Sequence, residues 1–95
     1  MFNINKANPT KLTVKSTLFE NLLGIPILLS GAGVTASITG STFKNNVGTC
    51  SGAVYVDDGA AVSQSGNTFK NNTCVYTQYN CKANGFCKMV NNKCQ

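Results

Sequence analysis

Apolar and polar residues alternate with a period of two in two separate stretches of this chain, residues 11–15 and 34–39. The apolar positions of these stretches are Leu12, Val14, Val34, Ala36 and Ile38, and the positions between them hold Thr, Ser or Lys. Such a period turns the apolar side chains to one face of an extended segment, so both stretches are predicted to be half-buried strands. No stretch combines a capping residue with a helical period, and the predicted class is all-β.

A six-residue string occurs twice, as STFKNN in residues 41–46 and as NTFKNN in residues 67–72, so Phe43 and Phe69 lie 26 positions apart. Aligned without a gap, residues 24–40 fall on residues 50–66. An earlier, degraded copy contains Phe19, which precedes Phe43 by 24 positions. A change of two residues in the length of the bend after Asn21 would bring this copy to the same 26-residue spacing. A unit of this length cannot bury an apolar face alone and is stable only when neighbouring units stack on it.

Short strands joined by Gly and Asn bends, with no helix between them, favour a parallel β-helix of about two to three coils. In such a stack identical residues one coil apart lie over each other: phenylalanine rings stack and asparagine amides form hydrogen-bonded chains. Asn also tolerates the left-handed backbone of a sharp corner. The predicted ladder residues are Phe43, Asn45, Asn46, Phe69, Asn71 and Asn72.

Two of these elements carry a family resemblance. Residues 43–46 (FKNN) and 69–72 (FKNN) fit the Phe-x-x-Asn element, and residues 51–55 (SGAVY) resemble the Gly-Gly-Ala-Ile-Tyr element, of the polymorphic outer membrane protein repeats. The resemblance covers residues 11–76 and departs from the pattern at Ser51, where Gly is usual. It implies a right-handed, pectin-lyase-like β-helix and a surface-displayed stalk, typically an adhesin. The same scaffold also carries polysaccharide lyases and hydrolases.

Composition argues against an enzyme. The chain has no His and no Arg, and its acids are Glu20, Asp57 and Asp58, so few groups can transfer protons near neutrality. Glycoside hydrolysis usually needs two facing carboxylates, whereas adjacent Asp57 and Asp58 would point apart in a strand. The sequence Asp57-Asp58-Gly59 is predicted to be a solvated turn, with a weak calcium-binding corner as the alternative. No catalytic residue is predicted.

A rival motif lies in residues 31–36 (GAGVTA), which resemble the G-x-G-x-x-A cofactor loop of dinucleotide-binding folds. That loop requires a helix whose N-terminus meets the pyrophosphate. Residues 37–42 (SITGST) are β-branched and interrupted by glycine, which disfavours a helix. No cofactor is therefore predicted.

The cysteines lie in the second half of the chain: Cys50, Cys74, Cys81, Cys87 and Cys94. Four of them sit in a C-terminal segment with no apolar run long enough for a core, so cross-links are expected to stabilise it. The four allow three pairings. The expected partner of Cys50 is Cys74, one coil later, which would leave one of the last three free or intermolecular. A zinc cluster is the alternative, but without His or a C-x-x-C pair no metal ligand is predicted.

The formal net charge of +5 comes from lysines, clustered early at Lys6, Lys11 and Lys15 and late at Lys82, Lys88 and Lys93. Nucleic-acid binding is not predicted, because Arg is absent and the coil needs the phenylalanines inside. These clusters are expected to be solvated faces with weak attraction to anionic glycans or membrane surfaces. Residues 22–29 are apolar but too short to span a bilayer, and residues 1–6 do not resemble a signal peptide.

The prediction is thus a lead-in or cap at residues 1–10, β-helix coils at residues 11–76 and a cysteine-rich tail at residues 77–95. The predicted function is a non-catalytic structural or adhesive module, a segment of a larger secreted or surface protein that binds a glycan or a host or cell-surface protein. Cysteine density points to an oxidising, extracellular location. The open coil ends call for flanking coils or self-association. The alternatives are a carbohydrate-binding or polysaccharide-degrading β-helix fragment and a small disulfide-stapled secreted binding protein.

Overall fold

The structure is a computed structural model that describes residues 2–5, 9–75, 81–91 and 93–94. Every regular element within these residues is a β-strand, so the all-β prediction is confirmed. The strands are β1 (Phe2–Asn5), β2 (Thr10–Lys15), β3 (Leu18–Glu20), β4 (Ile27–Ser30), β5 (Val34–Thr39), β6 (Thr42–Lys44), β7 (Val47–Gly48), β8 (Val54–Asp57), β9 (Ala61–Ser65), β10 (Thr68–Lys70), β11 (Thr73–Cys74), β12 (Phe86–Val90) and β13 (Lys93–Cys94).

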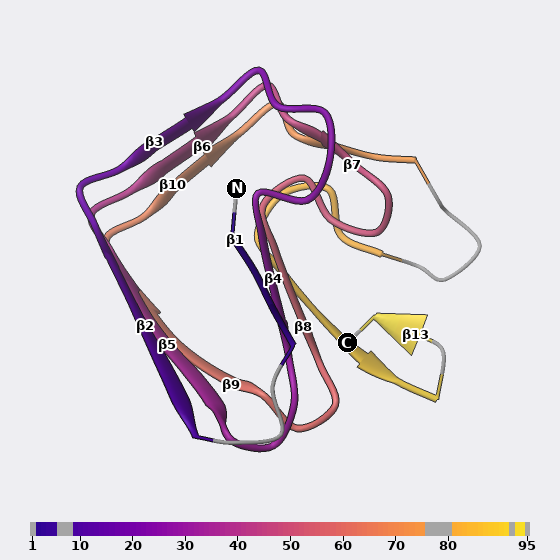
Figure 1. The fold of residues 1–95 in the computed structure, drawn as a ribbon. Coiled ribbons are helices and arrows are strands. Elements are labelled where there is room, and N and C mark those ends of the chain that lie inside the picture. Colours follow the sequence, from indigo (N-terminus) through magenta and orange to yellow (C-terminus); the bar gives the residue numbers. More distant parts are fainter. Residues whose placement is uncertain (1, 6–8, 76–80, 92, 95) are drawn as a thin grey trace.

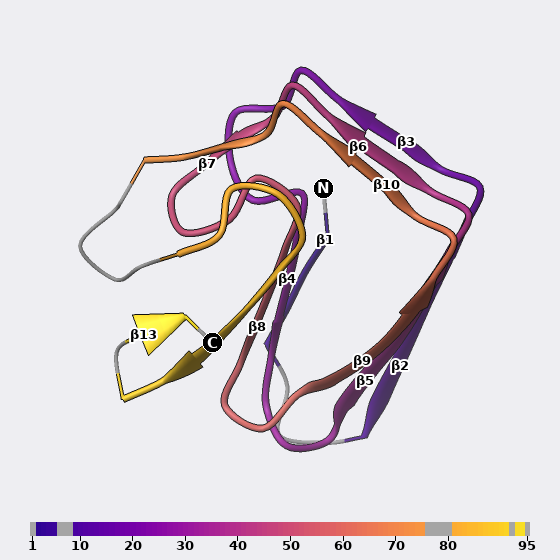
Figure 2. The same ribbon diagram turned by 180° about the vertical axis from the view of Figure 1, so that it is seen from behind.

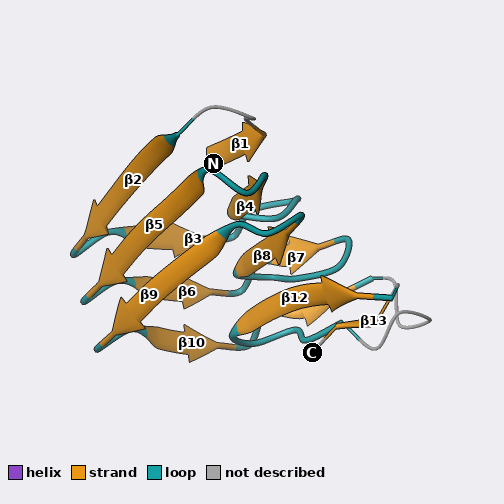
Figure 3. Cartoon of the chain, turned by 90° about the horizontal axis from the view of Figure 1, so that it is seen from below, coloured by secondary structure: helices purple, strands orange, loops and turns teal. Residues whose placement is uncertain are grey.

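Strands from successive repeats pair side by side rather than strands adjacent in sequence. The sheets have the orders β2-β5-β9, β3-β6-β10, β7-β11 and β1-β4-β8-β12-β13. All pairings are parallel except the antiparallel pairing of β12 with β13. Figure 1 looks along the stack, where the three large sheets form the sides of a roughly triangular outline, and Figure 2 shows it from behind. The side view in Figure 3 shows the strands of each sheet lying over one another.

The two copies of the six-residue string lie over each other in register. Thr68, Phe69 and Lys70 of β10 pair with Thr42, Phe43 and Lys44 of β6. β3 adds the degraded copy on the other side, with Phe19 opposite Phe43. The repeat seen in the sequence is therefore a spatial repeat of strand positions.

The gapless alignment of the two repeats is wrong by one residue over β4 and β8. It matches Leu28 with Val54, whereas the strand register pairs Ile27 with Val54. The phase change is also not at the bend after Asn21, because Leu23 still bridges to Val47 at the first-copy offset of 24 positions. The extra residues lie in the connection of residues 48–53, which is longer than its counterpart before β4. Counted between paired positions, the turn at residues 58–60 is one residue shorter than its counterpart after β4, so β5 and β9 again pair at an offset of 26 positions.

The core is enclosed by the three large sheets. Alternate residues of each strand point inward, as the burial of β5 shows, where Val34, Ala36 and Ile38 are buried and the residues between them are not. The molecule measures 33 × 32 × 20 Å. Its shortest dimension matches a stack of about four strand levels at ~4.8 Å spacing. The core residues are Val14, Phe19, Ile27, Leu29, Val34, Ala36, Ile38, Phe43, Ala53, Val54, Val56 and Ala60.

The sharp corners fall at equivalent positions of each copy. Asn21, Asn45 and Asn71 have φ angles of 56°, 55° and 54°, in the left-handed region that Asn tolerates better than most residues. A second corner holds Ser16, Gly40 and Gly66, whose φ angles are 48°, 59° and 64°. The repeated Asn and Gly residues therefore set the bends between sheets.

Strand pairing extends beyond the predicted coil segment at both ends. β1, within the predicted lead-in, pairs with β4, and β12, within the predicted tail, pairs with β8. Parts of both predicted end segments, including Lys6, lie outside the described residues. The described part of the chain contains no helix with the length and apolarity that a membrane crossing requires.

Candidate binding face

The outer face of the β2-β5-β9 sheet carries a regular set of polar side chains, which we call the hydroxyl face. Its positions follow from strand register, because residues that pair across the sheet point the same way. The three rows are Lys11, Thr35 and Ala61; Thr13, Ser37 and Ser63; and Lys15, Thr39 and Ser65. Strand geometry spaces neighbouring positions by ~4.8 Å across the sheet and ~6.6 Å along each strand.

Six of the nine positions of the hydroxyl face carry a hydroxyl group, two are lysines and one is Ala61. Thr13, Thr35 and Ser63 are exposed, as are both lysines. Hydroxyl groups both donate and accept hydrogen bonds, and the lysine ammonium groups add positive charge at the β2 edge. None of the nine positions is acidic or aromatic. The face therefore offers dense hydrogen bonding to a polar ligand and attraction for an anionic one.

All three acidic residues are engaged in contacts within the stack. Glu20 on β3 lies 3.3 Å from the ammonium of Lys44 on β6. At the turn after β8, Ser30 donates to Asp58 at 3.0 Å, and Asp57 accepts from the backbone N–H of Asp58 at 2.7 Å. Asp57 thus ends β8, and Asp58 lies in the turn that follows, where Gly59 has a φ of 83°. The acids bind a neighbouring strand and the turn itself.

Tyr55 lies beside this turn on the outer side of β8. Its hydroxyl donates to a carboxylate oxygen of Asp57 at 3.4 Å. Desolvation, and after it the negative charge of Asp57, raises the pKa of Tyr55 to about 12. The phenol therefore stays neutral at physiological pH and acts as a hydrogen-bond donor.

The predicted phenylalanine positions form a column through the core. The rings of Phe19 and Phe43 are 4.8 Å apart and nearly parallel, and those of Phe43 and Phe69 are 5.2 Å apart. Phe2 and Phe86 meet the two ends of this column edge-on, at 6.2 Å from Phe19 and 5.5 Å from Phe69. The column joins all levels of the stack and is closed by an edge-on ring at each end.

The asparagine positions divide into two groups with different roles. Asn46 and Asn72 are buried, and their amide groups bond to the backbone of the preceding level rather than to each other. Asn72 accepts from the backbone N–H of Asn46 at 3.1 Å and donates to the carbonyl of Phe43 at 3.1 Å. Asn45 and Asn71 instead have exposed side chains at the corners. Asn71, the acceptor position of an Asn-x-Thr sequence, is therefore accessible.

Sequence reasoning missed two polar contributors to these columns. Asn84 accepts from the backbone N–H of Asn72 at 2.9 Å and so continues the buried asparagine column into the C-terminal segment. Asn67 accepts from the backbone N–H of Ser41 at 2.9 Å and donates to the carbonyl of Ile38 at 2.9 Å. Asn84 does not follow the 26-residue period, so the repeat gave no signal for it.

The cysteine pairing differs from the expected one. Cys50 forms a disulfide with Cys81 rather than Cys74, and Cys87 forms one with Cys94. The expected pairing fails because the C-terminal segment folds back over residues 48–53 and brings Cys81 to Cys50. Cys74 donates from its sulfur to the carbonyl of Thr49 at 3.4 Å. The cross-links, together with the pairing of β12 with β8, tie the C-terminal segment to the stack.

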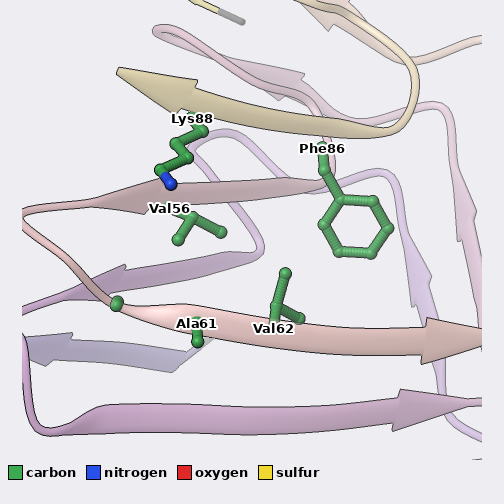
Figure 4. Close-up of a pocket in the computed structure, with 6 residues that line it drawn as sticks. Val56, Ala61, Val62, Phe86 and Lys88 are labelled. Atoms are coloured by element: carbon green, nitrogen blue, oxygen red, sulfur yellow. The ribbon is translucent and has the colours of Figure 1, made fainter. Parts of the chain in front are cut away.

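A cavity of about 280 Å³ lies at the C-terminal end of the core, where β12 adds a strand beyond β8 but none of the described residues pairs with the free edge of β9. It is lined by Val56, Ala60, Ala61, Val62, Phe86 and Lys88. Figure 4 shows Phe86 reaching from β12 toward Val62, and Lys88 toward Val56. Five of the six lining residues have apolar side chains, and the sixth, Lys88, is a cation.

The segment that resembles a dinucleotide-binding loop is a turn followed by a strand. Gly31 has a φ of 117°, and β5 begins at Val34. The helix N-terminus that such a loop needs is replaced here by a strand of the β2-β5-β9 sheet. In comparisons with family models, curated proteins and solved structures, nothing matches this chain.

Proposed function

We propose that this chain is a segment of a right-handed parallel β-helix, similar to the polymorphic outer membrane protein repeats, and that it acts as a non-catalytic adhesive module at a cell surface. The ligand we propose is an anionic glycan, bound on the hydroxyl face. The observation that carries the proposal is the in-register array of hydroxyl and lysine side chains on the outer face of one sheet.

Three features support this function. The array combines many neutral hydrogen-bonding groups with the charges of Lys11 and Lys15, which suits a polymer of hydroxylated, negatively charged sugars. The three acids serve the scaffold and lie away from this face. The two disulfides fit an extracellular location.

The alternative of a carbohydrate-binding or polysaccharide-degrading β-helix fragment calls for an exposed face that carries acids or aromatic side chains. The hydroxyl face holds neither type of residue. The other alternative, an independently folded stapled peptide, requires residues 74–95 to stand apart from the coils. The parallel pairing of Phe86, Cys87 and Lys88 with β8 favours a continuous stack instead.

The test compares binding of two charge-matched variants to a sulfated polysaccharide and to its desulfated form. The first variant, Lys11→Gln with Lys15→Gln, removes both lysines of the hydroxyl face. The second, Lys70→Gln with Lys82→Gln, removes the same charge from other exposed positions. The first variant is expected to lose most binding to the sulfated polymer and the second to retain most of it, with affinity that falls as salt rises.

A third variant, Thr13→Val with Thr35→Val, tests the hydroxyl groups without altering charge. It keeps β-branched side chains that suit strands and removes two exposed hydroxyls. Reduced binding of this variant supports the hydroxyl face. Equal losses in the two lysine variants would show that only net charge matters and would refute the proposed face.

A further inference from the structure

The four cysteines of the two disulfides come together in one cluster, which we call the cysteine cluster: Cys50, Cys81, Cys87 and Cys94. All four sulfur atoms lie within 4.8 Å of one another. Between the two disulfides, the sulfur of Cys50 lies 3.3 Å from that of Cys94 and 3.7 Å from that of Cys87. Two disulfides thus share one compact volume instead of fastening separate parts of the molecule.

The fold supplies these four residues from different segments. Cys50 lies in the connection between β7 and β8, Cys81 precedes β12, Cys87 lies on β12 and Cys94 on β13. Cys87 pairs with Tyr55, which points away from the core, so Cys87 points the same way. Cys87 nevertheless has no exposed surface. The other cysteine segments therefore cover it. Cys50 is also buried, so two of the four cysteines of the cluster are shielded from solvent.

These separations suit a tetrahedral metal site. With zinc–sulfur bonds of about 2.3 Å, the sulfurs of a four-thiolate site lie ~3.8 Å apart along each edge of the tetrahedron. The cluster's contacts between disulfides are already at that scale, so small side-chain rotations after reduction would place all four sulfurs around one ion. Structural zinc sites are closed and four-coordinate, and a cluster of four cysteines with two buried members can supply all four ligands.

The charge of the chain is also compatible with thiolates. Lys82 follows Cys81 in the sequence, and its side chain is exposed. Lys88 follows Cys87 on β12 but points to the opposite side of that strand, toward the core. A zinc ion with four thiolates carries a net charge of −2, which is opposite in sign to the net charge of +5 of the chain.

We propose that the reduced chain binds one zinc ion through the cysteine cluster, and that oxidation to the two disulfides releases it. In the reducing direction, two equivalents of a dithiol each donate two electrons and two protons, so both S–S bonds become thiols and the dithiols become disulfides. Zn²⁺ then displaces four protons from the four thiols. In both states the cluster fastens the C-terminal segment to the stack.

The test uses the full chain, reduced with a phosphine under anaerobic conditions and titrated with Co²⁺ as a spectroscopic probe. We expect one Co²⁺ per chain, with the absorption of a tetrahedral four-thiolate site, and stoichiometric displacement by Zn²⁺. Far-UV circular dichroism of the same samples should show strand structure that increases on metal addition, because binding and folding are coupled. The oxidised chain should bind no Co²⁺.

The variants Cys87→Ser and Cys94→Ser are expected to lose the four-thiolate spectrum, whereas Cys74→Ser, outside the cluster, should retain it. Absence of Co²⁺ binding by the reduced wild-type chain would overturn the proposal, whether or not that chain is folded. So would a four-thiolate spectrum that survives in Cys87→Ser, or one that Cys74→Ser removes.

Discussion

The two ends of the stack differ in the side chains that occupy their inward positions. At the N-terminal end the inward positions of β1 and β2 hold Ile4, Leu12 and Val14. At the C-terminal end the equivalent inward positions hold Gln64, opposite Ile38, and Lys88, opposite Val56. The apolar interior is thus continued at the N-terminal end, whereas at the C-terminal end two inward positions are polar and stand beside the apolar Val62 and Phe86.

This difference indicates a direction of assembly. An inward-pointing charge such as Lys88 cannot be covered by a further apolar level without a large desolvation cost, and natural sheets use such charges to block edge-to-edge association. Among the described residues, the N-terminal level has no inward-pointing charge and exposes Phe2 at 40% of its surface. We therefore expect a second copy of the chain to associate at the N-terminal end rather than at the C-terminal end.

The largest expected effect concerns the cross-links that hold the C-terminal end. In the chain-entropy model, the Cys50–Cys81 disulfide, which closes a separation of 31 residues, contributes about 4 kcal/mol to the free energy of unfolding. The Cys87–Cys94 disulfide, with a separation of 7, contributes about 2 kcal/mol. Denaturant unfolding of Cys50→Ser/Cys81→Ser and Cys87→Ser/Cys94→Ser, without reductant and with a chelator, measures both. If Cys87→Ser/Cys94→Ser lowers the free energy of unfolding more than Cys50→Ser/Cys81→Ser does, the Cys50–Cys81 disulfide is not the main cross-link of the C-terminal end.

The phenylalanine column allows the two ends to be compared with one substitution. Phe19 is 5% exposed and lies between two rings, so Phe19→Ala is expected to lower the free energy of unfolding by about 3 kcal/mol. Phe69 is only partly buried, and Phe69→Ala should cost about 2 kcal/mol. Equal costs would mean that β12 and Phe86 cover the C-terminal end as fully as β1 covers the N-terminal one.

The sequence predicted the central levels better than the ends. Phe43 and Phe69 have identical neighbours, so their register could be inferred directly, and the corner role of Asn follows from its backbone preference. The one-residue shift between β4 and β8 depends on how residues 48–53 pack. The 26-residue repeat of the sequence carries no information about that packing. The pairing of Cys50 with Cys81 and the placement of Asn84 likewise depend on a C-terminal segment that leaves the repeat and folds back.

The polar inward positions give a more direct test of the difference between the ends. Replacing both Lys88 and Gln64 with Val makes the C-terminal end apolar, like the opposite end. Contact between unlike ends does not close on itself, so open chains longer than dimers are expected to grow with concentration. Sedimentation velocity over a concentration series measures this growth. The control is Lys70→Val, which removes a charge from the outer side of β10. If this variant associates as strongly as the double variant, the loss of charge alone explains the association.

The smallest effect concerns Tyr55, which lies near the C-terminal levels beside the turn of Asp57. Its pKa is about 12 in the folded chain and ~10 in an unfolded one. Because the folded pKa is the higher one, the stability contributed by the neutral phenol is fully present below pH ~10 and is lost as pH rises toward ~12. Rapid spectrophotometric titration should therefore show one late phenolate step that Tyr55→Phe lacks. Asp57→Asn removes the nearby charge and should move that step to lower pH. If the step stays in place, desolvation alone holds the proton, and the Tyr55–Asp57 hydrogen bond adds little to this part of the stack.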